Sequence, residues 1–152
     1  MAVNSTETYK KNGDVFIKTL GIITATGVKI DLLPNSKGAG GVWGALSIFE
    51  NIESPFVSGS VVIHEGQNLL QHLPIIGLET LIIEYKTPGV QDRYTKLECS
   101  IYKVGDRSFT GENQRFQMYK LHFVSKEYMQ NLQKKVHKSY NGTVAENVYN
   151  IW

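Results

Sequence analysis

The chain has little cysteine, little net charge and no long apolar run, and each shortage excludes a class of protein. A single cysteine, Cys99, cannot form an intrachain disulfide, so the chain is not a disulfide scaffold and suits a reducing compartment. Sixteen basic against fourteen acidic residues give a net charge of +2, which predicts no specific nucleic acid partner. The N-terminal MAVNSTETYKKNGD lacks the apolar core of a signal peptide, and no segment reaches membrane-spanning length. We therefore expect a protein that is used without secretion and has no membrane partner.

The overall composition is that of an ordinary globular domain. The 152 residues are 41% hydrophobic and 20% charged, enough for one domain with a real core. Residues 1–14 are polar and show no periodicity, so we expect them to form a flexible arm. Globular structure is expected from Val15 onward.

Alternating apolar and polar residues dominate the middle of the chain and predict strands. Leu97, Cys99 and Ile101 share one face of such a segment, as do Tyr119 and Leu121 of another. Residues 105–114 look like a long polar connection. Six or seven short strands predict a mainly β fold with minor α, an antiparallel barrel or sandwich. The expected strands cover residues 15–27, 28–33, 42–51, 55–65, 79–87, 94–104 and 115–124.

Helical patterns are confined to three places. One short helix is expected between strands, at residues 68–73, where Pro74 would end it. Residues 125–138 show apolar side chains at helical spacing, with Ser125 as a cap. A capping box at residues 143–146 predicts a last helix, which runs to Trp152 without a stop signal. We therefore expect the native polypeptide to continue. The apolar face of this last helix is Val144, Val148 and Ile151.

Residues that could carry catalysis or bind a cofactor do not form convincing patterns. Cys99 lies on the apolar side of its strand and His122 on the polar side, which opposes a thiol and base pair. His64 and His72 are not one helical turn apart, as a zinc-protease motif requires. GAGGVWG at residues 38–44 has Trp43 where a dinucleotide fingerprint needs its third glycine. We predict no catalytic residue, no cofactor and no metal site.

Apolar residues at the edges of loops are the remaining signal for function. The glycine-rich stretch 35–41 predicts a flexible loop, and aromatic or aliphatic side chains near turns are common in protein interfaces. The same side chains could instead cover the ends of a barrel, and the sequence favours neither interpretation. The candidate subunit-interface residues are Lys37, Gly38, Gly40, Gly41, Trp43, Phe56, Ile75 and Ile76.

Three segments in a particular order carry a resemblance to a known family. They are IFENIESPFVSGSVVIHEGQNLLQHLPIIGLETLIIEYKTPG (48–89), RFQMYKLHFVSKEYMQN (115–131) and KSYNGTVAENVYNIW (138–152). Together they resemble the N-terminal, tail-tube-like domain of the baseplate hub proteins of contractile-tail bacteriophages. The resemblance covers about residues 15–152, and its most specific parts are LPIIGLE (73–79) and KSYNG (138–142).

The resemblance implies a fold, a role and partners. The fold would be a tail-tube-type antiparallel β-barrel at residues 15–137, followed at 138–152 by the start of a further segment. The role would be that of a structural virion protein, made in the host bacterial cytoplasm, that joins the tail tube to the central spike. Its partners would be its own copies in a homotrimeric ring, the tail tube protein, the spike and other baseplate proteins. Such hubs usually carry two barrels, whereas this chain has one.

Two alternatives stay open beside the hub interpretation. A tail-tube or tube-completion protein belongs to the same structural class but would form a hexamer. A small enzyme or ligand-binding barrel belongs to a different class and would place Cys99, His64 and His122 at one site. Thiol labelling under native conditions separates the two classes, because a Cys99 in the core would be unreactive and a Cys99 at a site would react rapidly.

Overall fold

One antiparallel sheet of seven strands forms the body of the protein, seen here in a computed structural model that describes residues 15–33, 42–66, 75–87, 93–110, 116–135 and 137–151. The order of the strands across the sheet is β2-β1-β5-β6-β7-β4-β3. The expected arm (1–14), glycine-rich loop (35–41) and short helix (68–73) lie outside the described residues. The strands are β1 (Phe16–Ile23), β2 (Lys29–Asp31), β3 (Trp43–Asn51), β4 (Ser54–Glu65), β5 (Thr80–Lys86), β6 (Thr95–Thr110) and β7 (Phe116–Ser125).

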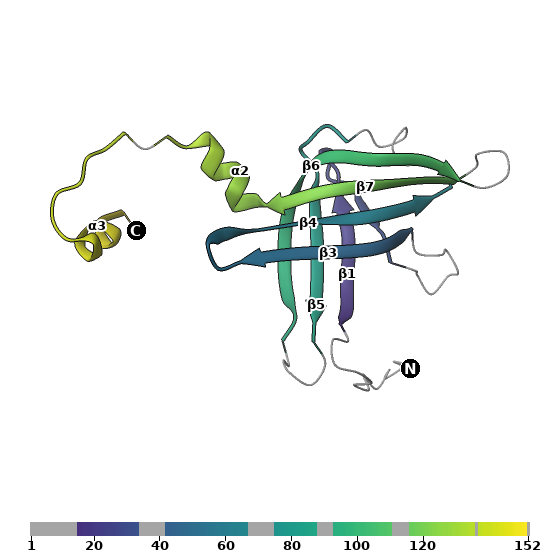
Figure 1. Ribbon diagram of the computed structural model, residues 1–152, viewed down its shortest axis with the longest axis horizontal. Coiled ribbons are helices and arrows are strands. Elements are labelled where there is room, and N and C mark those ends of the chain that lie inside the picture. Colours follow the sequence, from purple (N-terminus) through teal and green to yellow (C-terminus); the bar gives the residue numbers. More distant parts are fainter. Residues whose placement is uncertain are drawn as a thin grey trace.

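The sheet bends over on itself and forms two crossed layers (Figure 1). β2, β1, β5 and the first part of β6 make one layer, and the rest of β6 with β7, β4 and β3 makes the other. β6 can belong to both layers because it is irregular at two points, where its pairing with β7 shifts register after Ile101 and again after Gly105. Asp106, inside the second irregularity, has a φ of 51°, in the left-handed region that few residues other than glycine adopt. Such bulges bend a strand and increase its twist.

β6 is longer than the sequence predicts. Residues 105–114 were expected to form a polar connection, but the strand continues to Thr110. Pairing of Ser108 with Met118 and of Thr110 with Phe116 supplies the backbone hydrogen bonds. This part of β6 has little apolar alternation because its ladder with β7, and not burial of its own side chains, holds it in the sheet.

The hydrophobic core lies between the two layers, and the alternation predicted for the strands is confirmed. Residues facing inward are buried, while their neighbours Lys96, Glu98 and Lys120 face outward and form ion pairs. At Gly59, a Cβ atom would collide with the Phe123 ring, so this position needs a glycine for the layer to pack. The buried core consists of Leu20, Ile22, Leu32, Val61, Ile63, Leu81, Ile83, Cys99, Ile101, Tyr119, Leu121 and Phe123.

The mainly β class with minor α is confirmed, but the sheet does not close into the expected barrel. Its two edge strands are β2 and β3. Next to them, the Val42 N–H donates to the Leu32 carbonyl at 3.2 Å, the one backbone hydrogen bond across this gap within the described residues. β2 has only three residues, too few for a ladder with the nine-residue β3. Side chains therefore have to cover the rest of the gap between the layers.

Two helices follow the sheet, α2 (Lys126–Gln133) and α3 (Val144–Ile151). The predicted capping box of α3 is confirmed: the Thr143 N–H donates to Glu146 Oε2 at 3.0 Å, and the Glu146 N–H donates to Thr143 Oγ1 at 3.3 Å. α2 extends from the end of β7, and α3 stands apart from the sheet (Figure 1). Within the described parts of the chain, no helix is long and apolar enough to cross a membrane.

α2 is shorter than the helix predicted over residues 125–138. It ends at Gln133, because Lys134 has an extended backbone with φ −98° and ψ 122°. No residue of α2 is buried, so little packing opposes fraying, and the adjacent Lys134 and Lys135 repel each other. Val136, expected on the apolar face, lies outside the described residues.

Candidate assembly surfaces

The turn between residues 75 and 79 is organised by a buried carboxylate. Glu79 is only 3% exposed and accepts two backbone hydrogen bonds, from Ile76 N–H to Oε1 at 2.9 Å and from Gly77 N–H to Oε2 at 2.8 Å. Gly77 has a φ of 91°, which favours glycine. The Glu79 carbonyl also accepts from the Ile101 N–H at 3.3 Å. The turn is therefore fixed by its own side chain and tied to β6.

This geometry separates the two isoleucines of the turn. Ile75 is partly buried and packs against the core, as a side chain that covers the end of the sheet would. Ile76 is 64% exposed and Leu78 is 72% exposed. The two candidate interface residues at this turn therefore differ. Ile75 packs against the core, whereas Ile76 and the neighbouring Leu78 are accessible to a binding partner.

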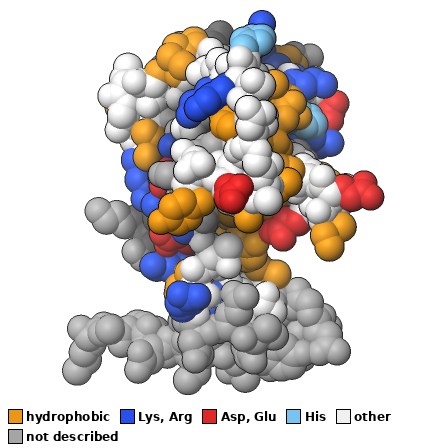
Figure 2. Space-filling model, turned by 90° about the vertical axis from the view of Figure 1, so that its left-hand side faces the viewer, with side chains coloured by type: hydrophobic (Ala, Val, Ile, Leu, Met, Phe, Trp, Pro, Cys, Tyr) orange, Lys and Arg blue, Asp and Glu red, His pale blue; other side chains and the backbone are white. Residues whose placement is uncertain are grey.

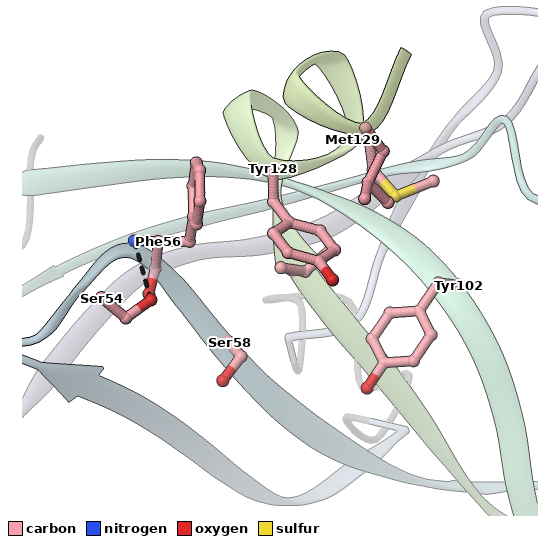
Figure 3. A pocket seen from close by; sticks show the side chains of 8 residues that line it. Ser54, Phe56, Ser58, Tyr102, Tyr128 and Met129 are labelled. Atoms are coloured by element: carbon pink, nitrogen blue, oxygen red, sulfur yellow. Dashed lines mark hydrogen bonds between the residues drawn. The ribbon is translucent and has the colours of Figure 1, made fainter. Parts of the chain in front are cut away.

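A second apolar surface lies on the outer face of the sheet beneath α2 (Figure 3). This groove, called the α2 groove below, has a volume of about 530 Å³. The candidate residue Phe56 is one wall, and the side chains of Tyr102, Tyr128 and Met129 surround the space with it. Of the described residues that line the groove, none is charged, and the polar side-chain groups among them are hydroxyls. The lining is Ser54, Phe56, Ser58, Tyr102, Val124, Tyr128, Met129 and Leu132.

Two contacts hold α2 over this groove. The rings of Phe56 and Tyr128 meet edge to face, with centroids 5.2 Å apart and planes at 78°. At the start of the helix, Lys126 Nζ lies 3.0 Å from Glu98 Oε2. Lys96 also pairs with Glu98, at 2.8 Å, and the two lysines hold the pKa of Glu98 at about 2. The helix is attached at its first two turns, while Leu132 near its end is 60% exposed.

Trp43 takes a different position from the other candidates. It is partly buried, packs against the core and lines an opening of about 580 Å³ where the sheet fails to close. Ile17, Ile48 and Tyr85 line the same opening, and Glu50 lies at it as well. Burial, with a smaller effect from the Glu50 carboxylate, raises the pKa of Tyr85. Trp43 therefore covers the gap between the layers, whereas the glycine-rich residues 37, 38, 40 and 41 lie outside the described residues.

The side chains considered for catalysis do not come together. Cys99 is 0% exposed in the core, and burial raises the pKa of its thiol to about 11. His122 lies on the outer face of β7, with its ring centroid 6.2 Å from that of Tyr102. His64 is exposed on the outer face of β4, beside Gly44. Within the described residues, no three His, Cys, Asp or Glu side chains lie close enough to hold a metal ion.

One buried polar cluster was not anticipated from the sequence. Glu65 is 2% exposed and pairs across the sheet with Gln117, which is 8% exposed. Arg107 donates two hydrogen bonds to Gln117 Oε1, at 3.2 and 2.9 Å. Burial, followed by the negative charge of Glu65 and a hydrogen bond to it, raises the pKa of Tyr119. The cluster connects β4, β6 and β7, and its groups satisfy one another.

Exposed apolar side chains are unusually frequent at the turns. Figure 2, which faces the end of the molecule that carries α2 and α3, shows hydrophobic side chains in several patches between charged ones. Contiguous apolar patches on a protein surface commonly mark interaction sites. Large apolar side chains at or near strand ends and turns that are more than half exposed include Phe49, Ile52, Ile76, Leu78, Phe109 and Phe116.

The α2 groove was the surface that sequence reasoning missed. Tyr128 and Leu132 were recognised as an apolar helical face, and Phe56 as an interface candidate. The pairing of this helix with the outer face of β4 depends on the direction in which β7 enters α2, which local patterns do not encode. Comparison with known proteins found no matching family model, no matching curated protein and no matching solved structure.

Proposed function

We propose that this protein is a structural component of a bacteriophage tail baseplate, a hub or tube-initiating subunit that assembles into a ring. In that role it would join the tail tube to the central spike, with its own copies, the tube protein and the spike as partners. The proposal includes no catalysis and no cofactor. It rests on the resemblance of residues 15–152 to the hub family and on one feature of the surface.

That feature is the rigid apolar turn at residues 75–79. A turn that displays Ile76 and Leu78 to solvent loses little backbone freedom on binding if its backbone is already fixed, and Glu79 fixes it through two hydrogen bonds. Exposed apolar side chains on a preformed surface suit a permanent contact with another subunit. The same LPIIGLE segment is one of the two most specific parts of the family resemblance.

Ring formation also requires that different surfaces of one subunit meet. A closed ring uses heterologous contacts, in which one patch docks against a different patch on the next copy. The described residues offer at least two separate apolar surfaces, the turn at residues 75–79 and the α2 groove. This supports a ring more than a two-fold dimer, which needs only one self-complementary patch.

The size of the assembly tests the proposal. Native mass spectrometry and negative-stain electron microscopy of the purified chain should show closed rings of three copies. Rings of six copies would favour the tail-tube or tube-completion alternative. A protein that stays monomeric or stops at a dimer at concentrations where rings are expected would contradict the proposal in both forms.

A further inference from the structure

We propose that α3 of one copy docks into the α2 groove of a neighbouring copy, so that each subunit holds the next through this helix. The inference rests on the proposed ring assembly and names the contact that links the subunits. Its two halves are present in every chain: an apolar groove, and a helix whose apolar side chains Val144 and Val148 are exposed.

Among the residues that the structure describes, none covers the apolar side of α3. Val144 is 81% exposed, Val148 is 51% exposed and Tyr149 is 86% exposed. Helices shorter than about 12 residues are marginal in water unless tertiary packing supports them. α3 has eight residues and a reciprocal capping box, which defines its start but buries no apolar surface. It needs a surface to pack against in order to persist.

The polarity of α3 matches that of the groove. Successive residues of a helix are about 100° apart, so Val144 and Val148 lie on one side and Glu146 points about 200° away from Val144. The apolar face is therefore free of charge, as the groove lining is. Asn147 flanks this face, and the Ser58 hydroxyl in the groove is a hydrogen-bonding group suited to an amide.

Other exposed apolar segments fit the groove less well. Phe49 and Ile52 at the β3–β4 turn are interleaved with Glu50 and Glu53. Phe109 of β6 lies under Arg107, whose guanidinium carbon is 5.2 Å from the ring centroid. Docking either segment would bring charged groups close to an uncharged, apolar lining, which is costly.

The connection between α2 and α3 favours docking on another copy. Residues 134–143 can span about 33 Å when extended, at 3.3 Å per residue, which is comparable to the width of a domain of this size. Lys134, Lys135 and Lys138 lie in this connection, and like charges extend a linker. The backbone leaves α2 in an extended conformation at Lys134, and α3 stands away from its own sheet (Figure 1).

Exchange of this kind links subunits in one direction. The groove of one copy receives the helix of the second, whose own groove receives the helix of the third. The two contacting patches are different, so the contact is heterologous and closes into a ring if the rotation between subunits permits. Each subunit gives one helix and receives one.

Two single variants and their mixture test the exchange in the full-length chain. Val148→Lys places a charge on the docking face of α3, and Leu132→Lys places one at the rim of the groove. Both positions are exposed, and lysine is compatible with a helix, so both variants should fold. Each variant alone should be monomeric by light scattering. Their mixture should form a one-to-one heterodimer, because one retains a functional groove and the other a functional helix.

The control is a lysine substitution at an equally exposed valine outside both docking surfaces. Val28→Lys changes a valine that is 52% exposed, close to the 51% of Val148, and should assemble as the unchanged chain does. Assembly of Val148→Lys at wild-type concentration would overturn the exchange while leaving the proposed ring function intact. Monomers that do not combine on mixing would also overturn the exchange, because an intact groove and an intact helix would both be present and would fail to bind. If the two variants form heterodimers but the unchanged chain forms no closed rings, the exchange would be retained and the hub function contradicted.

Discussion

Glu79 illustrates how a single side chain determines the shape of a turn that the rest of the molecule uses. Its carboxylate accepts hydrogen bonds from two consecutive backbone N–H groups, those of Ile76 and Gly77. Both donors lie in the segment that displays Ile76 to solvent. A buried carboxylate is costly unless hydrogen-bonded, and these two bonds are the compensation within the turn.

Removing this carboxylate should destabilise the fold. Glu79→Ala leaves the Ile76 and Gly77 N–H groups without their acceptor, and we expect the free energy of unfolding to fall by about 2–3 kcal/mol. Glu79→Gln retains one acceptor oxygen and should lose less. Urea denaturation followed by circular dichroism measures both. Equal losses for the two variants would show that the volume of the side chain matters here and its acceptor oxygens do not.

Cys99 should behave as a core residue toward thiol reagents. Burial raises the pKa of its thiol to about 11, so near neutral pH almost none is in the reactive thiolate form. We expect labelling of the native protein to occur only through unfolding, with a rate that increases with denaturant. Labelling of the urea-unfolded chain is the control. Rapid labelling of the native protein would contradict the buried position and revive the enzyme interpretation.

Among the secondary-structure elements, the helix α2 is held against the sheet by few attachments. Its specific contacts with the sheet include the Phe56–Tyr128 ring pair and the Lys126–Glu98 ion pair, and none of its residues is buried. An element held this weakly is expected to open locally before the sheet unfolds. Loss of the Lys126–Glu98 ion pair is therefore expected to favour local opening of α2.

Protonation of Glu98 should loosen α2 in acid. Its folded-state pKa of about 2 lies below the usual value of about 4.3, so its stabilising contribution is present above pH 4.3 and lost as the pH falls toward 2. Because the pair is partly exposed, we expect the contribution to stay below about 1 kcal/mol and to shrink in salt. Other carboxylates titrate in the same range.

The comparison with Glu98→Gln isolates this contribution. The difference in unfolding free energy between the unchanged protein and the variant should be largest near neutral pH and approach zero near pH 2. Hydrogen exchange of the α2 amides in both proteins checks that the helix is the part affected. A difference that does not change with pH would assign the effect of the substitution to packing.

The sequence predicted the strands well where apolar alternation is strong and poorly where pairing alone holds the chain. Cys99, Ile101 and Leu121 were placed on the correct face, because burial on one side of a sheet imposes period two. The extension of β6 beyond Gly105 escaped prediction because its ladder with β7 is a non-local property. The same limit applies to the α2 groove, whose walls come from three strands and a helix.

At the scale of the whole molecule, folding and assembly draw on different apolar residues. Within the described parts of the chain, the core between the layers has twelve buried side chains, and partly buried residues such as Trp43 and Ile75 cover its open sides. The exposed turn residues add nothing to this core. A subunit built in this way can fold alone and still carry surfaces that only its neighbours cover.

The paired isoleucines of the turn make this division measurable. Ile75→Ser removes a side chain that packs against the core, and we expect the free energy of unfolding to fall by about 1–3 kcal/mol. Ile76→Ser alters a side chain that is 64% exposed and should change stability by less than about 0.5 kcal/mol. If the turn meets a neighbouring copy, Ile76→Ser, and more strongly Ile76→Ser with Leu78→Ser, should weaken ring assembly.

The two readouts have to be taken on the same samples. Urea denaturation gives the stability of each variant, and native mass spectrometry across a concentration series gives its assembly. Ile75→Ser should lose stability and assemble normally under conditions where it is folded, because its side chain does not face a neighbour. A large loss of stability in Ile76→Ser would place that residue in the core after all. Unchanged assembly in the Ile76 and Leu78 double variant would remove the turn from the ring contact and leave the α2 groove as the surface that joins the subunits.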